Sequence, residues 1–216
     1  MKQEKVIEVV GLKKSFGKFV ALQDVNFYVN QGEIFGFIGP NGAGKSTTIR
    51  VLLGILRATE GTTTVFGMDA WKNAVAIHKR VAYVPGDVNL WPNLTGGQVI
   101  DMFISLNGQM VNNILRDKLI ERFKLDPTKR CRTYSKGNRQ KVALVAAFAT
   151  DADLYILDEP TSGLDIDMQQ VFKDCIKEIK EAGKTVLLSS HIVSEVEELC
   201  TRVATIRDGV LEVTTK

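Results

Sequence analysis

Apolar residues occur along the chain in two patterns, short unbroken runs and longer stretches with helical spacing. The run Leu154–Leu157 is typical of a strand that is buried on both faces, whereas Asp165–Ala182, which Gly183 follows, is typical of an amphipathic helix. Because strands and helices alternate, the pattern favours an α/β fold with a mostly parallel sheet. The other expected strands are Val6–Leu12, Phe19–Val29, Glu33–Ile38, Thr62–Phe66, Val81–Val84 and Thr185–Ser189, with a closing hairpin of Val203–Ile206 and Val210–Val213; the other expected helices are Lys45–Leu53, Asn138–Thr150 and Val193–Cys200.

Two stretches depart from this alternation and predict additions to the core. The N-terminal stretch is rich in β-formers and carries turn signals at Gly11, Gly17 and Gly32, which favour an antiparallel β subdomain. Residues from about 93 to 124 have apolar positions at helical spacing, interrupted by Asn107-Gly108. We therefore interpret residues 1–216 as a single domain, with a helical subdomain inserted in the core at approximately residues 86–150.

The composition is that of an ordinary globular domain and disfavours several classes of protein. Hydrophobic residues make up 44% of the 216 residues and charged residues 25%, and the net charge of +3 does not by itself indicate a nucleic-acid partner. Cys131, Cys175 and Cys200 are far apart and odd in number, which favours a reducing compartment. No apolar run approaches the roughly 18 residues of a membrane helix, and residues 1–5 lack the apolar run of a signal peptide. Work at a membrane is therefore expected to need a partner.

A glycine-rich segment between an apolar strand and a helix is the first candidate for chemistry. Its glycines would let backbone N–H groups approach phosphate oxygens, and the helix N-terminus would add further donors. Lys45 is suited to the β- and γ-phosphates of ATP, and the Ser46 hydroxyl is suited to Mg²⁺. A chance Gly-rich turn is the alternative, but the strand before and the helix after favour nucleotide binding. The segment is Gly39-Pro40-Asn41-Gly42-Ala43-Gly44-Lys45-Ser46-Thr47, called the phosphate loop below.

An acidic pair follows the predicted strand Leu154–Leu157. Asp158 and Glu159 are costly at the end of a buried strand unless they serve a ligand, and ligands of α/β sheets bind at the carboxyl ends of strands. We expect Asp158 to hold Mg²⁺ and Glu159 to orient the attacking water; a helix-capping acid pair is the alternative. His191 follows another apolar strand, where we expect it to sense the γ-phosphate, although a lone histidine is more often structural.

Taken together, these motifs resemble those of the ATP-binding-cassette (ABC) ATPase family over nearly the whole chain. The segment Tyr134-Ser135-Lys136-Gly137-Asn138 resembles the family's Leu-Ser-Gly-Gly-Gln signature, and we call it the signature segment. Ser162–Asp165 resembles the D-loop of the family, His191 its switch histidine, and Phe16 the aromatic residue that stacks on adenine.

The resemblance implies a P-loop NTPase core that binds ATP and Mg²⁺ as cofactors. It implies catalytic roles for Lys45, Glu159 and His191, metal contacts from Ser46 and Asp158, and further nucleotide contacts from Phe16, Ser135, Gly137 and Asp165. A second cassette is the expected partner, in a homodimer where each ATP lies between one phosphate loop and the other chain's signature segment. A symmetric pair fits such an arrangement.

The chain departs from the family pattern at three places. Lys136 and Asn138 replace a Gly and the Gln of the signature. Gly86 stands where the family usually has a Gln that reaches Mg²⁺ and couples to the partner, and whether the neighbouring Asp87 compensates is left open. The sequence stops at Lys216, where many relatives continue, so it is either a short member or a shortened chain.

The function implied by the resemblance is that of the ATPase subunit of a membrane transporter, working with a separate membrane-spanning permease. Tyr83–Thr95 resembles drug- or antibiotic-export cassettes, which favours export, and the subunit is expected in the cytoplasm on the inner face of the membrane. The alternative is a soluble mechanical ATPase of the same family that acts on nucleic acid or ribosomes. The sequence shows one phosphate loop and no sustained heptads, which disfavours that class, and we expect no nucleic-acid partner. A small-molecule kinase would not explain Ser135–Lys141 or Ser162–Asp165.

Overall fold

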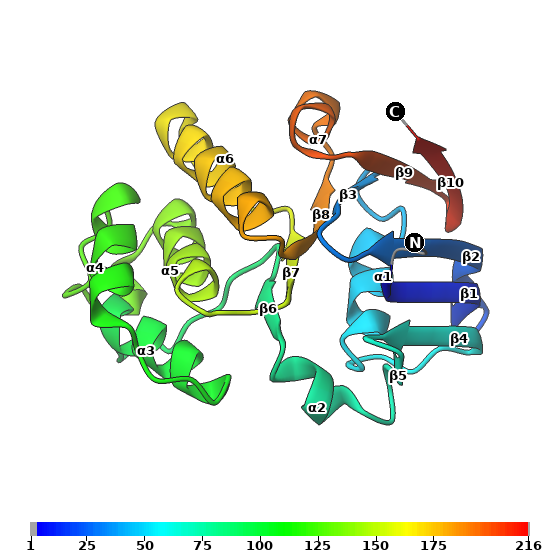
Figure 1. The fold of residues 1–216 in the computed structure, drawn as a ribbon, viewed down its shortest axis with the longest axis horizontal. Helices are drawn as coiled ribbons and strands as arrows, with labels where there is room; N and C mark the ends of the chain where they lie inside the picture. Colours follow the sequence, from blue (N-terminus) through cyan, green and yellow to red (C-terminus); the bar gives the residue numbers. More distant parts are fainter. Residues whose placement is uncertain (1–3, 216) are drawn as a thin grey trace.

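Two β-sheets and the helices around them make up the computed structural model of the chain, which describes residues 4–215. Residues 1–3, part of the stretch that lacks a signal-peptide pattern, and Lys216 lie outside the described residues. Figure 1 shows the smaller sheet on the right, a group of helices on the left and the larger sheet between them. The strands are β1 Lys5–Phe16, β2 Phe19–Asn30, β3 Ile34–Ile38, β4 Glu60–Val65, β5 Met68–Asp69, β6 Val81–Val84, β7 Leu154–Asp158, β8 Thr185–Ser190, β9 Arg202–Arg207 and β10 Val210–Thr215. The helices are α1 Lys45–Leu52, α2 Ala74–His78, α3 Gly96–Leu106, α4 Asn113–Arg122, the 3₁₀ turn η1 Cys131–Thr133, α5 Lys136–Phe148, α6 Ile166–Glu181 and α7 Val193–Leu199.

The larger sheet confirms the predicted α/β fold. Its strand order is β10-β9-β3-β8-β7-β6, and all neighbours except β10 and β9 pair in parallel. Every residue of β3, β7 and β8 is buried, as expected for mainly apolar strands that are covered on both faces. The parallel arrangement brings the carboxyl ends of these three strands to one edge of the sheet.

The smaller sheet confirms the predicted antiparallel β addition, with the order β2-β1-β4-β5. The turn predicted at Gly11 is wrong. Gly11 lies inside β1 with a φ of 61°, where the register between β1 and β2 shifts, so a bulge lets the strand continue instead of ending it. The short elements β5 and α2 were not predicted, because two and five residues are too few to give a periodic signal.

Helices α3, α4 and α5, called the helical group below, lie together at the left of Figure 1. The stretch predicted to be helical is divided at Asn107-Gly108 into α3 and α4. Thr95 begins α3 with a capping box, in which its hydroxyl accepts the Gln98 N–H and the Gln98 side chain accepts the Thr95 N–H. Helix α5 begins at Lys136, two residues before the predicted start. That residues 86–150 form an inserted subdomain stays a proposal.

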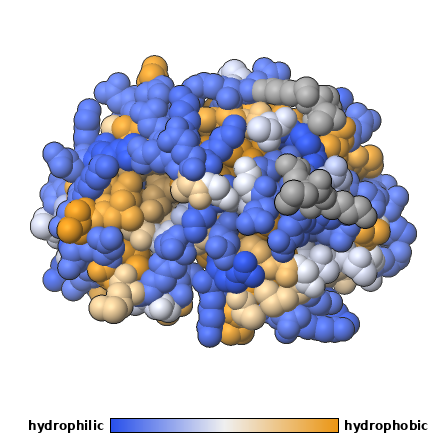
Figure 2. All heavy atoms as spheres, viewed as in Figure 1, coloured by the Kyte–Doolittle hydropathy of each residue, from blue (hydrophilic) through white to orange (hydrophobic). Residues whose placement is uncertain are grey.

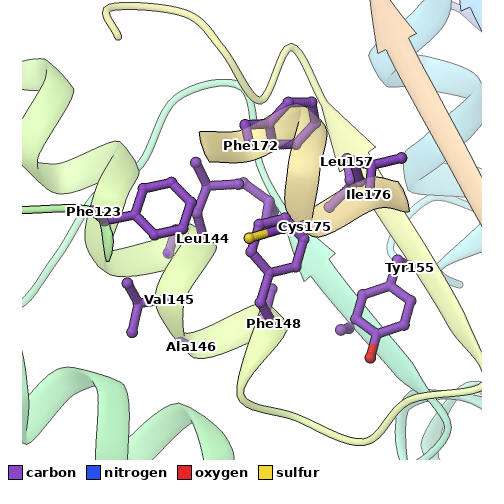
Figure 3. Close-up of a cluster of buried hydrophobic side chains, with 14 of the residues drawn as sticks. Phe123, Leu144, Val145, Ala146, Phe148, Tyr155, Leu157, Phe172, Cys175 and Ile176 are labelled. Atoms are coloured by element: carbon purple, nitrogen blue, oxygen red, sulfur yellow. The ribbon is translucent and has the colours of Figure 1, made fainter. Parts of the chain in front are cut away.

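A buried aromatic cluster attaches the helical group to the larger sheet and to α6 (Figure 3). The ring of Phe148 on α5 packs against Phe123, Phe172 and Tyr155, with centroid separations of 6.2, 6.0 and 6.5 Å. Such aromatic pairs contribute about 0.5–1.5 kcal/mol each beyond the area that they bury. Because Tyr155 lies on β7, the cluster holds α5 in place relative to the strand that ends in the acidic pair.

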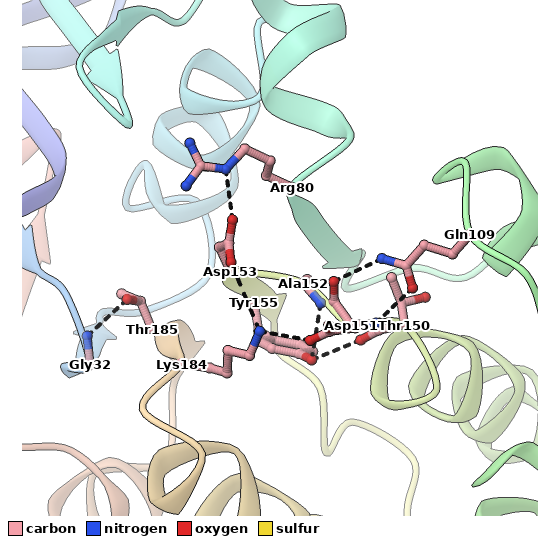
Figure 4. Close-up of polar contacts among 10 residues, drawn as sticks. All are labelled: Gly32, Arg80, Gln109, Thr150, Asp151, Ala152, Asp153, Tyr155, Lys184 and Thr185. Atoms are coloured by element: carbon pink, nitrogen blue, oxygen red, sulfur yellow. Dashed lines mark hydrogen bonds and ion pairs between the residues drawn. The ribbon is translucent and has the colours of Figure 1, made fainter. Parts of the chain in front are cut away.

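Polar contacts hold the segment before β7, at the opposite end of that strand (Figure 4). The side-chain amide of Gln109 donates to the Asp151 carbonyl and accepts the Asp151 N–H, both at 2.8 Å. Arg80 donates to Asp153 at 2.7 Å, and Lys184 pairs with Asp151 at 2.7 Å. These contacts tie the α3–α4 connection and the starts of β6 and β8 to the start of β7.

Within residues 4–215 no helix is long and apolar enough to cross a membrane. The face shown in Figure 2 is mostly hydrophilic, with separate hydrophobic areas, one of them over the helical group. A groove of about 490 Å³ lies between the helical group and the segments α2 and β6. Its lining is mainly apolar and includes Val75, Val81, Val88, Phe103, Leu106 and Ala143.

Candidate functional site

The carboxyl ends of β3, β7 and β8 bring three predicted motifs to one edge of the larger sheet. Ile38 pairs with Ser190, and Asp158 pairs with Ser189, in the parallel register of these strands. The phosphate loop therefore leaves β3 beside the end of β8, and Glu159 leaves β7 beside the same strand end. This is the edge at which open α/β sheets bind ligands.

The phosphate loop folds back on itself and then starts α1. The Pro40 carbonyl accepts the Ala43 N–H at 3.2 Å. Gly44, the residue before α1, has a φ of 116°, a conformation that glycine adopts readily and other residues rarely adopt. The first-turn amides of a helix have no intrahelical carbonyl to bind, so those of α1 are available to an anion such as phosphate.

Lys45 is buried, with 5% of its surface exposed, although its side chain is a cation. Its Nζ donates to the Gly39 carbonyl at 2.5 Å and to the Pro40 carbonyl at 3.2 Å. It also lies 3.0 Å from Oε1 of Glu159. Burial of an ammonium group is costly unless such partners surround it. The structure thus brings together two of the predicted catalytic residues that are far apart in the sequence.

Glu159 lies between Lys45 and His191. Its Oε2 is 2.5 Å from Nδ1 of His191, whose side chain is half exposed. The backbone of Glu159 has a φ of 49°, in the left-handed region that residues other than glycine rarely adopt. Backbone strain of this kind concentrates at functional sites, so the conformation favours a functional role for Glu159.

Ser189 belongs to the site, although the sequence reasoning did not identify it. Its buried hydroxyl donates to Oδ1 of Asp158 at 2.5 Å and accepts the N–H of Glu159 at 3.1 Å. Ser189 therefore fixes both members of the acidic pair. The signal in the sequence was a polar residue at the end of an otherwise apolar strand, because a buried hydroxyl needs hydrogen-bond partners.

Ser190 and Glu195 hold the segment around His191 and were also missed. The Ser190 hydroxyl donates to the buried carboxylate of Glu195 at 2.7 Å and accepts the Ile192 N–H at 3.0 Å. These two bonds fix the backbone on both sides of His191. Glu195 gave no separate signal, because it lies among other acidic residues of α7.

Most of the predicted residues line two cavities that share Asn41, Ser46 and Glu159. The larger has a volume of about 360 Å³ and the smaller about 170 Å³. Ser46 and Asp158 both line the larger cavity, so a hydroxyl and a carboxylate, ligand types that Mg²⁺ accepts, face the same space. The larger cavity is lined by Asn41, Ser46, Arg50, Tyr83, Pro85, Gly86, Asp87, Lys136, Asp158, Glu159, Ser162 and His191, and the smaller by Pro40, Asn41, Gly42, Gly44, Lys45, Ser46, Thr47 and Glu159.

Charges of both signs and one neutral phenol face the larger cavity. The cations Arg50 and Lys136 come from α1 and α5, and the anions come from the acidic pair and Asp87. Burial, and secondarily the charge of Asp158, raises the pKa of Tyr83 to about 12. The Tyr83 hydroxyl is therefore neutral near pH 7 and offers the cavity a hydrogen-bonding group without charge.

Six predicted nucleotide contacts line neither cavity, namely Gly39 and Ala43 of the phosphate loop and four residues from other segments. Ser135 and Asp165 cap α5 and α6, where the hydroxyl of one and the carboxylate of the other each accept a backbone N–H. Gly137 lies in the first turn of α5. Phe16 ends β1 with 48% of its surface exposed. A single chain thus does not bring these four residues to the cavities that its own phosphate loop lines.

Gly86 contacts the acidic pair, at the place where a Gln was expected. A Cβ atom at Gly86 would lie 3.3 Å from the carbonyl oxygen of Asp158 and 3.6 Å from Cβ of Glu159. The exposed Asp87 lines the larger cavity beside it. The segment after β6 therefore presents a carboxylate to the site, and its role in place of Gln stays a proposal.

Comparisons with known proteins agree with one another. The family model described as ABC transporter matches residues 22–162. The chain is similar to the ABC transporter ATP-binding protein NatA of Bacillus subtilis, at 36% identity over 88% of this chain and 79% of that protein. It is also similar to the Nod factor export ATP-binding protein I of Bradyrhizobium diazoefficiens, at 34% identity over 94% of this chain and 68% of that protein. A solved structure of an ATP-binding subunit of an ABC transporter superposes with a TM-score of 0.86 at 29% identity, covering 96% of this chain and 90% of that one.

Proposed function

The chain belongs to the ABC transporter family as an ATP-binding, ATP-hydrolysing subunit, and we propose that Lys45, Glu159 and His191 carry out the hydrolysis that drives a membrane permease. The observation that carries the assignment of roles is the placement of Glu159 between Lys45 and His191 at the carboxyl end of β7. An acid, a cation and an imidazole at the edge of a phosphate loop have the chemistry that transfer of a phosphoryl group to water requires.

Each of the three side chains has a distinct role in this proposal. Lys45 balances the charge of the β- and γ-phosphates, and the first-turn amides of α1 bind their oxygens. The Lys45 ammonium lies 3.0 Å from the Glu159 carboxylate. The phosphates of ATP therefore compete with Glu159 for this ammonium group. Glu159, released from that pair, orients the water that attacks the γ-phosphorus, and His191 contacts the γ-phosphate.

The residues present fit Mg²⁺ bound together with ATP. Magnesium in nucleotide sites is usually held by one or two protein oxygens, with phosphate oxygens and waters completing the octahedron. Ser46 and Asp158 supply a hydroxyl and a carboxylate to one cavity. The Ser189 hydrogen bond uses Oδ1 of Asp158, so the carboxylate has a second oxygen for the cation. Bound there, Mg²⁺ would neutralise charge on the phosphates.

The residues outside the cavities support a functional unit of two chains. Ser135 and Gly137 lie at the N-terminus of α5, a helix of 13 residues whose first-turn amides suit an anion. We propose that these groups and Asp165 bind the ATP held by the phosphate loop of a second copy, and that Phe16 stacks on the adenine of the chain's own ATP. In a symmetric pair the same contacts occur twice.

The apolar groove beside the helical group is the surface that we propose for the permease. Tyr83 and Pro85 line both this groove and the larger cavity. A partner bound in the groove would therefore contact the same segment as the nucleotide, which couples hydrolysis to movement of the permease. This arrangement would hold the subunit at the inner face of the membrane. The name of the Nod factor export relative supports export as the direction.

Replacing Glu159 by Gln tests the catalytic assignment. Glu159→Gln keeps the shape of the side chain but removes the charge that orients water, so hydrolysis should fall by roughly 100-fold or more while ATP still binds. Phosphate release and the ATP retained by the purified protein measure the two effects. Glu60→Gln is a matched control, because Glu60 forms an exposed ion pair with Lys13 on the smaller sheet. Normal hydrolysis by Glu159→Gln would refute the assignment.

Co-purification of the tagged chain from detergent-solubilised membranes of its source tests the partner. A membrane protein with several spans at equal stoichiometry would identify the permease. Recovery of ribosomal or DNA-binding proteins without such a protein would contradict the transport role and leave the ATPase chemistry in place.

A further inference from the structure

The signature segment and the loop after the acidic pair contact each other within one chain. Lys136, the first residue of α5, donates from Nζ to Oγ of Ser162 at 2.8 Å. Ser162 lies three residues after Glu159, and its N–H donates to the Glu159 carbonyl at 3.1 Å. One hydrogen bond and one tight turn therefore connect the start of α5 to Glu159.

Close packing of two backbones accompanies this hydrogen bond. A Cβ atom at Gly137 would lie 2.4 Å from the carbonyl oxygen of Gly163, which is too close for any side chain. A Cβ atom at Gly163 would meet Cγ and Cδ of Lys136 at 3.5 and 3.6 Å, so the aliphatic part of Lys136 lies across Gly163. The contact thus consists of backbone, aliphatic chain and ammonium group, which is more than an isolated surface pair.

We propose that Lys136 is a positioning residue that couples the two nucleotide sites of the paired subunits. This inference rests on the proposed function. In that arrangement Glu159 acts on the chain's own ATP, while Ser135 and Gly137 contact the ATP of the second copy. The bond between Lys136 and Ser162 joins these two half-sites inside each chain, so a shift of the loop at Glu159 moves the start of α5.

A direct role in binding phosphate is the competing explanation for Lys136. Its side chain lines the larger cavity together with Glu159 and His191, and an ammonium group there could bind phosphate itself. The two roles differ in kinetics. A phosphate ligand contributes to binding of ATP and its loss raises KM, whereas a positioning residue contributes to the geometry of the transition state and its loss lowers kcat.

The experiment measures kcat and KM for ATP in Lys136→Ala, Ser162→Ala, the double variant and Lys136→Arg. The expected scale is that of one hydrogen bond from an exposed charged group. Each single variant should lower kcat by roughly five-fold and change KM by less than about two-fold. The double variant should be no slower than the slower single variant, because both remove the same contact. Lys136→Arg keeps a cationic donor and should restore most of the rate.

Three results would overturn the inference. They are an unchanged kcat in Lys136→Ala and Ser162→Ala, fully additive losses in the double variant, and a raised KM with normal kcat, which would make Lys136 a phosphate ligand. Lys129→Ala is the matched control, because Lys129 pairs with Asp126 in an exposed turn away from Ser162. Ser162→Ala changes no residue of α5. It therefore tests the Lys136–Ser162 hydrogen bond even if the Lys136→Ala variant does not fold.

Failure of this inference is distinguishable from failure of the proposed function. If the unsubstituted chain hydrolyses no ATP, or if Glu159→Gln hydrolyses it normally, the proposed function is wrong. Suppose instead that the unsubstituted chain hydrolyses ATP and that Glu159→Gln does not. If the Lys136 and Ser162 variants then give any of the three results above, only the coupling role of Lys136 is wrong.

Discussion

The phosphate-loop region and the signature region differ in how their polar groups are satisfied. In the first, Glu159 pairs with both Lys45 and His191, which come from segments after three different strands of one chain. In the second, Ser135 and Asp165 are satisfied locally, each by a backbone N–H of the helix that it caps. In the first region, therefore, the charged groups depend on one another, whereas in the second each helix cap is satisfied within its own helix, although the two segments also touch through Lys136–Ser162 and Gly137–Gly163.

This difference separates two kinds of defect. Removing Lys45 from its largely buried pair with Glu159 leaves that carboxylate unpaired, which costs several kcal/mol and disturbs both binding and folding. Changing a residue near a surface helix end leaves the rest of the chain satisfied. Its effect should then be confined to what the helix end contacts, which in the proposed function is a second copy of the chain.

The largest effect is expected from Lys45→Ala. The substitution removes the cation that the proposal assigns to the β- and γ-phosphates and leaves Glu159 without its buried partner. Loss of a charge-assisted contact of this kind should weaken ATP binding by roughly 100-fold or more. Titration calorimetry with ATP and Mg²⁺ measures the affinity, with Lys129→Ala as the control. Unchanged affinity would contradict the role of the phosphate loop. It would also remove the proposed difference between the two regions.

The phosphate-loop region was largely predictable because its signals are local. A glycine-rich segment and an acidic pair each follow an unbroken apolar run, and parallel strands bring such carboxyl ends to one edge of the sheet. The strand order β3-β8-β7 then places them close together. The pairing of Glu159 with Lys45 and His191 is then a consequence of topology. Ser189 was missed although a polar residue at the end of an apolar strand is visible in the sequence, because its partner is decided by the register that puts it opposite Asp158.

The signature region was recognised by resemblance, and its contacts were not predicted. Nothing in the local pattern indicates that Lys136 reaches Ser162 or that Gly137 packs on Gly163, since these segments belong to different elements. The prediction of a turn at Gly11 was wrong for a related reason. A glycine in a β-rich stretch is compatible with a turn or a bulge, and only the pairing of β1 with both β2 and β4 decides between them.

A smaller effect, confined to the second region, is expected from Gly137→Ala. The added methyl group would lie 2.4 Å from the Gly163 carbonyl oxygen, so the start of α5 must shift away from the D-loop. Overpacking of this size costs about 1–3 kcal/mol, and hydrolysis should fall by roughly 10-fold for a misplaced contact to the second ATP.

Binding of ATP to the single chain should stay within about two-fold of the original in Gly137→Ala, because the phosphate loop is untouched. Calorimetry and phosphate release measure the two quantities separately. Gly97→Ala on α3 is the matched control, since its added methyl group meets Pro127 at an ordinary 3.4 Å. A loss of ATP affinity equal to the loss of hydrolysis would show that the two regions are not separable within one chain.

The smallest effect is expected at alkaline pH and involves one tyrosine in each region. Burial is the main cause that raises the pKa of Tyr83, beside the acidic pair, and of Tyr134, beside Ser135, from 10.0 to about 12. Because both pKa values are higher in the folded state, the stability that they contribute is complete below about pH 10 and is lost as the pH rises towards 12. Tyr83→Phe and Tyr134→Phe should each reduce the loss of unfolding free energy between about pH 8 and pH 10.5, by roughly 1 kcal/mol or less.

Asp158→Asn distinguishes the two tyrosines. The charge of Asp158 raises the pKa of Tyr83, whereas the charges that raise the pKa of Tyr134 are those of Cys131 and Asp126. Removing the Asp158 charge should therefore lower the pKa of Tyr83 and leave that of Tyr134 unchanged. An alkaline titration followed by tyrosinate absorbance measures both, with the two Phe variants identifying each transition. Equal shifts at both tyrosines would mean that the field of the acidic pair extends to the signature segment, so that the two regions are electrostatically one site.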